Sequence, residues 1–270
     1  MATERRPRGR PREDKHEAKP NQSLEKALGL LKSLSNHDGL TLTDLADKAA
    51  MAPSTTHRLL STLAAHDLVA CDDANQTWSI GIEALRIGMA FQRRNKLLVA
   101  GRPAMTDLME ATGETVNMAI LDKDSVVFVT QVECEAPIRA FFRIGERRAI
   151  HASGIGKALL AHMPSERLEA FLKNRTLVRF TPTTLSEPDA LRADLDIIRH
   201  RGWAIDDEEA NSGMRCVAAA IFNEFGEARA GISLSGPSAR ITPDRLNALG
   251  VLVKAAAERI SDIIGGGLIT

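Results

Sequence analysis

The stretch Pro53-Ser54-Thr55-Thr56-His57-Arg58-Leu59-Leu60 decides the fold of the first part of the chain. Proline suits the first position of a helix, and leucines then recur at helical spacing, which predicts a helix over residues 53–66. One face of this helix is apolar, whereas the other carries hydroxyls, an imidazole and a guanidinium but no acid. The outer face consists of Ser54, Thr55, His57, Arg58 and Ser61. Because such side chains can reach phosphates and base edges, we interpret it as a DNA-reading face rather than an ordinary polar surface.

The segments on either side of this helix complete a small module. Upstream, leucines at helical spacing predict one longer and one short helix, the second capped by Thr41 or Thr43. Downstream, two short β-rich segments flank a polar tip at residues 72–76, as in a hairpin. The predicted elements are helices at residues 23–35, 43–47 and 53–66 and strands at residues 68–71 and 77–80. Three helices followed by a hairpin form a winged helix-turn-helix, which we place at residues 22–81.

A basic segment precedes this module. Its first twelve residues contain five arginines and one acid, although the whole chain balances 35 Lys+Arg against 35 Asp+Glu. Alternation of arginine with proline and glycine over residues 6–11 resembles the AT-hook, whose core is Arg-Gly-Arg-Pro, and would carry Arg8 and Arg10 into a narrow minor groove. A solvated basic arm is an equally open interpretation. Residues 1–21 hold hardly any large apolar side chain, so we expect a flexible arm.

The module is followed by two predicted connecting helices. Residues 82–98 form a linker helix by their apolar spacing, and a second helix runs over residues 98–112. These helices could form the seam of a homodimer or pack on their own domain. Residues 99–270 mix strands and helices, which predicts an α+β domain built on an antiparallel sheet flanked by helices. Its predicted strands are residues 115–121, 125–131, 217–222 and 228–234, and its predicted helices are residues 156–162, 165–172, 187–201 and 242–263.

Composition excludes several classes of protein. Of the 270 residues, 44% are hydrophobic and 26% charged, as in a soluble globular chain. Charge interrupts every apolar stretch before the roughly 20 residues of a membrane helix, and no apolar segment follows the basic start. The cysteines Cys71, Cys134 and Cys216 are odd in number and far apart, so we expect a cytoplasmic protein without a disulfide framework. Paired metal-ligand spacing is absent from the sequence, and we predict neither a metal nor a cofactor.

A glycine-rich turn, His151-Ala152-Ser153-Gly154-Ile155-Gly156-Lys157, is the clearest signal in the second half. It departs from a phosphate-binding loop at His151 and Ala158, so we reject nucleotide binding. The turn is instead typical of the start of a helix, whose N–H groups and dipole can hold a small anion such as a carboxylate. The alternative, a capping turn that needs glycine only for its geometry, stays open.

Other polar side chains could converge on this turn. Asp206 opens an acidic run that would by default be a solvated loop, and Cys216 precedes an apolar strand. Ser233 and Ser235 lie two apart on a strand, so both hydroxyls face the same side. Cys216, a histidine and Asp206 could also be a nucleophile, base and orienting acid. No nucleophile signature surrounds Cys216, and a DNA-reading module favours sensing over turnover, so we predict that the protein is not an enzyme.

These segments together resemble the bacterial isocitrate lyase regulator (IclR) family of transcription factors. The resemblance covers about residues 22–265 and is carried by residues 22–27, 53–60, 80–81, 113–117, 151–160 and 233–237. It implies a winged helix-turn-helix joined by connector helices to a GAF-like effector-binding domain. It also implies double-stranded operator DNA as a partner and assembly as a homodimer or a dimer of dimers.

Within the family the chain is most similar to the branch of glyoxylate-responsive regulators of allantoin utilisation and of the β-hydroxyaspartate cycle. The shared features are the Arg-Gly-Arg-Pro arm, residues 180–185, and an aspartate placed ten residues before a cysteine. The resemblance implies an effector site made of Gly154, Ile155, Asp206, Cys216, Ser233 and Ser235.

Two departures from the branch affect these expectations. Ile155 replaces a smaller residue, which narrows the pocket, and residues 75–78 of the wing lack the usual glycine and tyrosine. A glyoxylate carboxylate would bind the N–H groups of the turn and a serine hydroxyl, with its aldehyde or hydrated end at Asp206. Another small oxoacid such as pyruvate, or an aromatic acid, stays open as the effector, and so does the choice between activator and repressor.

Overall fold

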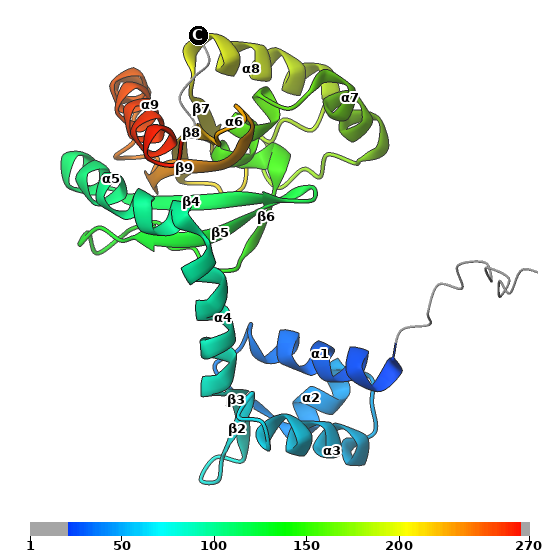
Figure 1. Ribbon diagram of the computed structural model, residues 1–270. Helices are drawn as coiled ribbons and strands as arrows, with labels where there is room; N and C mark the ends of the chain where they lie inside the picture. Colours follow the sequence, from blue (N-terminus) through cyan, green and yellow to red (C-terminus); the bar gives the residue numbers. More distant parts are fainter. Residues whose placement is uncertain (1–20, 266–270) are drawn as a thin grey trace, which may run out of the picture. The chain divides into compact units, whose positions relative to one another are not determined.

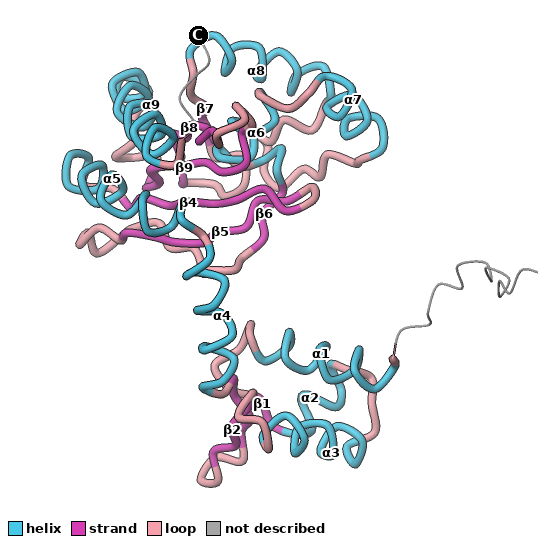
Figure 2. Tube along the Cα trace, in the orientation of Figure 1, coloured by secondary structure: helices cyan, strands magenta, loops and turns pink. Residues whose placement is uncertain are grey.

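The computed structural model describes residues 21–265 of the chain (Figures 1 and 2). It divides the chain into two compact units, one ending at Arg94 and the other beginning at Asn95. Arg8 and Arg10 of the predicted arm lie outside the described residues. Each unit is a fold in itself and has its own hydrophobic core.

The first unit has the predicted order of three helices and a hairpin. Its elements are α1 (Gln22–Leu34), β1 (Leu40–Thr41), α2 (Leu42–Lys48), α3 (Pro53–Ala64), β2 (Val69–Asp72), β3 (Thr77–Ile80) and α4 (Ile82–Arg94). Thr41 caps α2 in a capping box with Asp44, which settles the choice of cap in favour of Thr41. Leu30, Leu60 and Trp78 meet in the core between the helices and the small sheet β1-β3-β2.

The second unit, residues 95–265, is built on one six-stranded antiparallel sheet of order β6-β5-β4-β9-β8-β7. Its strands are β4 (Thr115–Asp122), β5 (Ser125–Val132), β6 (Arg147–Ala149), β7 (Ala204–Asp207), β8 (Met214–Phe222) and β9 (Ala228–Pro237). Its helices are α5 (Lys96–Thr112), α6 (Gly154–Ala161), α7 (Ser165–Asn174), α8 (Pro188–Arg201) and α9 (Leu246–Ile263), with single 3-10 turns η1 (Ile150–Ala152) and η2 (Pro243–Arg245). This is the α+β architecture that the sequence predicts.

Both faces of this sheet are covered by helices, as Figure 1 shows. Helices α5 and α9 enclose one core with Met118 and Ile232, and α6, α7 and α8 enclose the other with Ala218 and Leu195. The central pair β4–β9 is therefore buried on both sides, and α6 is held directly against β8 and β9. This arrangement places the start of α6 over the middle of the sheet.

Three strands and several boundaries differ from the sequence predictions. The strands β1, β6 and β7 have only two to four residues, too few for an alternating pattern to be recognised. Helix α6 begins at Gly154, two residues before the predicted start, because the Ser153 side chain accepts from Gly156 N–H as its cap. The last helix begins at Leu246 because the predicted first turn is the 3-10 turn η2.

Candidate functional site

The faces of α3 divide as its sequence predicts. Thr56, Leu60 and Leu63 are buried against the module, while Ser54, His57, Arg58 and Ser61 are exposed and Thr55 is half-buried. The exposed face carries no acidic side chain and is not tied down by ion pairs in the part of the chain that the structure describes. Its hydroxyl, imidazole and guanidinium groups are therefore available to phosphates and base edges.

The hairpin next to α3 supports this face from the side. His57 packs edge-on against Trp78 of β3, with 6.3 Å between ring centroids and an angle of 87°. Trp78 is itself buried among the leucines of the module. Trp78 is thus a core residue of this chain, and Asn75 and Gln76 at the tip of the wing are exposed.

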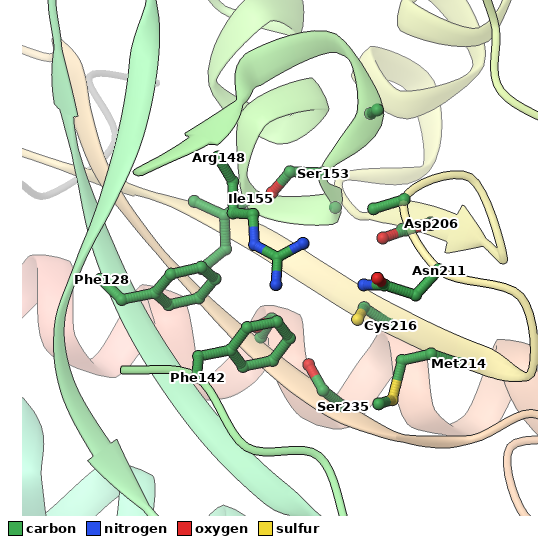
Figure 3. A pocket seen from close by; sticks show the side chains of 14 residues that line it. Phe128, Phe142, Arg148, Ser153, Ile155, Asp206, Asn211, Met214, Cys216 and Ser235 are labelled. Atoms are coloured by element: carbon green, nitrogen blue, oxygen red, sulfur yellow. The ribbon is translucent and has the colours of Figure 1, made fainter. Parts of the chain in front are cut away.

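One pocket of the second unit contains every residue that the family resemblance implies for the effector (Figure 3). It lies where α6, β7, β8 and β9 come together, and the empty space among its atoms is about 390 Å³ with the solvent at its mouth included. The predicted residues in its lining are Gly154, Ile155, Asp206, Cys216, Ser233 and Ser235. These residues come from four segments of the sequence, the first and last of which are more than 80 residues apart, and together they line one pocket.

Gly154 and Gly156, at the start of α6, have different structural roles. A Cβ on Gly156 would lie 2.0 Å from the Ile150 carbonyl oxygen, so this glycine is required for packing alone. A Cβ on Gly154 would point toward the Cβ atoms of Ala218, Cys216 and Asp206 at 3.2–3.8 Å, into the pocket. Gly154 thus brings the positive end of α6, with its first N–H groups, to the pocket. The capping geometry therefore does not prevent the N–H groups at the start of α6 from facing an anion, since Ser153 caps Gly156 while Gly154 faces the pocket.

Ile155 closes the inner side of the pocket. Its side chain is 1% exposed and packs on Gly231 of β9, where a Cβ would come within 2.7 Å of Ile155 Cγ2. The isoleucine therefore occupies space that a smaller residue would leave empty next to Gly231. Gly231 is the position that accommodates it.

Asp206 is a buried acid on the edge strand β7. Its carboxyl accepts the backbone N–H of Glu209 at 2.8 Å. Burial, together with the nearby Glu209 carboxylate, raises the pKa of Asp206 to about 7. Near neutral pH this group can therefore donate a hydrogen bond as an acid or accept one as a carboxylate.

In the acidic run after Asp206, Asp207 is exposed as expected of a solvated loop, Glu208 is half-buried, and only Glu209 departs from that expectation by being buried. Glu209 is 3% exposed and pairs with Lys157 of α6, which also lies 2.7 Å from Asp194 of α8. Thr184 donates its hydroxyl to the Glu209 carbonyl at 2.6 Å, and Thr181 donates to the Glu208 carbonyl at 2.7 Å. The threonine-rich segment 180–185 and Lys157 therefore hold the loop that bounds the pocket.

Cys216 is a packing residue with a protonated thiol. Its side chain is 7% exposed, and burial and the Asp206 charge raise the pKa of the thiol. The thiolate is the nucleophilic form of cysteine, so this environment suppresses nucleophilic chemistry. The arrangement of Cys216 and Asp206 therefore does not favour nucleophilic catalysis by the thiol.

Sequence reasoning missed several residues of the pocket. They are Phe128, Phe142, Arg148, Ala152, Ser153, Ala210, Asn211 and Met214. Phe128 could have been found, because it alternates with buried Val126 on a predicted strand. Arg148 and Phe142 lie on a three-residue strand and an irregular loop, which carry no periodic signal.

Comparison with known families identifies the chain. Residues 23–73 match the family described as the IclR helix-turn-helix domain. Residues 90–262 match the bacterial transcriptional regulator IclR C-terminal family. The chain belongs to the IclR family. The two matches correspond to the module that presents α3 and to the unit that contains the pocket.

Relatives within the IclR family cover almost the whole chain. The HTH-type transcriptional regulator BhcR of Paracoccus denitrificans is 47% identical over 97% of this chain and 95% of its own length. The HTH-type transcriptional repressor AllR of Klebsiella pneumoniae is 39% identical over 97% of both chains. The crystal structure of Thermotoga maritima IclR has 29% identity and a TM-score of 0.78, and the match covers 90% of this chain and 98% of that one.

These matches establish the general function of this IclR-family chain. It is a DNA-binding transcriptional regulator with a ligand-binding C-terminal domain, and it is not an enzyme, as the sequence predicts. Among the helices of residues 21–265, none is both long and apolar enough to cross a membrane.

Proposed function

We propose that this regulator changes its affinity for operator DNA when glyoxylate binds the pocket, and that it controls genes of glyoxylate or allantoin metabolism. One observation carries the proposal: Gly154, Ile155, Asp206, Cys216, Ser233 and Ser235 line one pocket together. A helix N-terminus and buried hydroxyls are the groups that hold a small carboxylate when little apolar area can be covered.

The pocket suggests how each part of glyoxylate would be held. The carboxylate would accept from the backbone N–H groups at Gly154 and Ile155 and from a serine hydroxyl of β9. The aldehyde, or its hydrate, would lie at Asp206, whose protonated carboxyl can donate to a carbonyl oxygen. Ile155 and Cys216 leave little room beside the aldehyde carbon, so the site favours two carbons over larger oxoacids.

Calorimetry on the full-length protein tests the effector. We expect glyoxylate to bind more tightly than pyruvate, and an aromatic acid such as benzoate to bind weakest. A gel shift with the same ligands then shows whether binding releases or tightens DNA, and thus separates a repressor from an activator. Tighter binding of pyruvate or benzoate would replace glyoxylate as the effector. Absence of heat with all three would overturn the assignment of the pocket.

For DNA, we propose that Ser54, Thr55, His57, Arg58 and Ser61 of α3 contact the major groove, and that Arg8 and Arg10 enter an adjacent minor groove. The acid-free exposed face of α3 supports the first part. For the arm, deletion of residues 2–20 should weaken binding most at operators with A·T-rich flanks. An equal loss at G·C-rich flanks would reduce the arm to a general counter-charge for phosphates.

We also propose that the chain assembles as a homodimer, or a dimer of dimers, through its connecting helices. Helix α4 buries no residue in its own unit and exposes a series of large apolar side chains, Ile82, Leu85, Ile87, Met89 and Phe91. A second copy of this helix would cover them. Light scattering should give a dimer or tetramer for the wild type and a smaller species for Leu85→Glu. A wild-type monomer at micromolar concentration would refute the assembly.

A further inference from the structure

Arg148 and its neighbour Arg147 on the strand β6 point to opposite faces of the sheet. Arg148 pairs with Val126 of β5, and its side chain turns to the face of the sheet on which α6 lies. Arg147 points the other way, because successive side chains on a strand alternate, and it forms an exposed ion pair with Asp122. The two adjacent arginines therefore reach opposite sides of the sheet.

The guanidinium of Arg148 is fixed in place by its surroundings. Its Nε lies 2.7 Å from a carboxylate oxygen of Glu146, and its plane lies over the Phe142 ring at 5.4 Å from the centroid. Phe142 is in turn stacked on Phe128 at 4.5 Å, nearly parallel. In Figure 3 the terminal nitrogens of the guanidinium extend into the space bounded by Asn211 and Cys216. Nε lies close to Glu146 but makes no hydrogen bond with good geometry, and the terminal nitrogens extend toward the pocket.

A carboxylate entering this pocket needs a positive charge. Asp206 lines the pocket as an acid, and Glu209 lies directly behind it. Lys157 is paired with Glu209 and Asp194 and is not among the residues that line the pocket. Among the lining residues, all of them in the described part of the chain, Arg148 is the single cation. Its charge also acts on Cys216, on which it has an electrostatic effect that favours the thiolate.

We propose that Arg148 is the residue that makes the pocket select an anion, by pairing its terminal guanidinium nitrogens with the carboxylate of the effector. The inference rests on the proposed function, because it takes a small carboxylate as the ligand. Two parallel N–H···O bonds from an arginine fork fit a carboxylate and exclude a neutral ligand of the same size. The N–H groups of α6 orient the ligand, and Arg148 supplies the charge.

Calorimetry with matched variants tests this role. Arg148→Met keeps a long stem over Phe142 and removes the charge, so glyoxylate should bind about 10- to 100-fold more weakly, as for loss of a charge-assisted hydrogen bond. Arg148→Lys keeps the charge without the fork and should fall between. Arg147→Met is the control and should bind as the wild type does. Equal affinity of Arg148→Met and wild type would overturn the inference while leaving the glyoxylate assignment intact.

A second measurement is independent of how much of a variant is folded. Glycolate and glycolamide have the same size, but only glycolate is charged, and the ratio of their affinities reports charge selection. The wild type should prefer glycolate at least about tenfold, and Arg148→Met should lose most of that preference. An unchanged ratio in Arg148→Met would overturn the role of Arg148. A wild type that binds no carboxylate at all would overturn both this inference and the proposed function.

Discussion

Lys157 of α6 and Glu209 of the loop after β7 form an ion pair in which both side chains are less than 5% exposed. The backbone N–H of Glu209 donates to the Asp206 carboxyl, so the ion pair also positions an acid of the pocket. A lysine buried in this way is stabilising only while its partners remain.

Removal of this lysine should destabilise the second unit. Lys157→Met leaves the Glu209 and Asp194 carboxylates without their cation, which should cost about 3–5 kcal/mol in the free energy of unfolding by urea. The double variant Lys157→Met/Glu209→Gln should recover part of the loss, since it also removes a buried charge. Lys254→Met is the control, because its ion pair with Glu258 is long, at 3.8 Å, and exposed. Equal stability of the two single variants would contradict the role of Lys157.

Asp206 should make stability depend on pH. Its pKa of about 7 lies above its ordinary value of 3.8, so the folded state keeps a proton that the unfolded state loses. The contribution of this carboxyl is therefore fully present below about pH 4 and is lost as the pH rises to 7. Asp206→Asn does not titrate, so its melting temperature should gain on the wild type as the pH rises from about 4 to 7, and the difference should stay constant above pH 7. Each pKa unit corresponds to about 1.4 kcal/mol, which gives an advantage of a few kcal/mol. Asp189→Asn, at a side chain that is 97% exposed, should show no such trend.

The protonation state of Asp206 should also determine the affinity for glyoxylate. Glyoxylate stays anionic above pH 5, whereas Asp206 ionises near pH 7 beside Glu209, with the Lys157 cation behind and the neutral Cys216 thiol in front. Affinity of the wild type should therefore fall as the pH rises from 6 to 8, and affinity of Asp206→Asn should stay nearly constant. Parallel pH profiles for the two proteins would refute this coupling.

Ser233 and Ser235 of β9 should each contribute a hydrogen bond to glyoxylate, and each contribution can be measured separately. Both are buried, and the Ser235 hydroxyl oxygen accepts the Asn117 side-chain N–H at 3.2 Å. Ser233→Ala or Ser235→Ala should weaken glyoxylate binding about 10- to 100-fold, because a bond to a charged group is worth ~1.5–3 kcal/mol. Ser165→Ala, at an exposed position of α7, is the control. Wild-type affinity in both variants would place the ligand elsewhere.

Arg58 should determine operator binding. It is exposed at the centre of the acid-free face of α3. If it reads a base, Arg58→Ala should cost ~1–3 kcal/mol of specific affinity, whereas a phosphate contact would weaken all sequences alike and flatten the salt dependence. A gel-shift titration on an operator found by footprinting distinguishes the two. Arg259→Ala, in the second unit, is the control, and wild-type affinity for Arg58→Ala would exclude α3 as the recognition helix.

Much of this fold could be predicted because its helices and long strands are periodic. The faces of α3 follow directly from the positions of Leu60 and Leu63, and the hairpin after α3 follows from the polar tip at residues 72–76. The alternation of Ser233 and Ser235 likewise places two hydroxyls in one pocket. These features depend on residues close together in the sequence, so they can be predicted from the sequence alone.

The remainder depends on contacts between distant segments. Nothing near Glu209 in the sequence indicates that Lys157, 52 residues earlier, would bury it. Arg148 enters the pocket only because the short strand β6 pairs with β5, and three residues give no alternation to detect. The pocket residues that were not predicted from the sequence are those whose position is determined by tertiary packing.

The contact between Ile155 and Gly231 has a consequence for how this pocket could evolve. Every amino acid except proline has a backbone N–H group, so the proposed anion end of the site would persist through other substitutions at residue 155. The space beside the proposed ligand, in contrast, is limited by side chains, among them Ile155, which rests on a glycine. A lineage could therefore acquire a larger oxoacid as its signal by a single shortening of that side chain, without rebuilding the part that recognises charge.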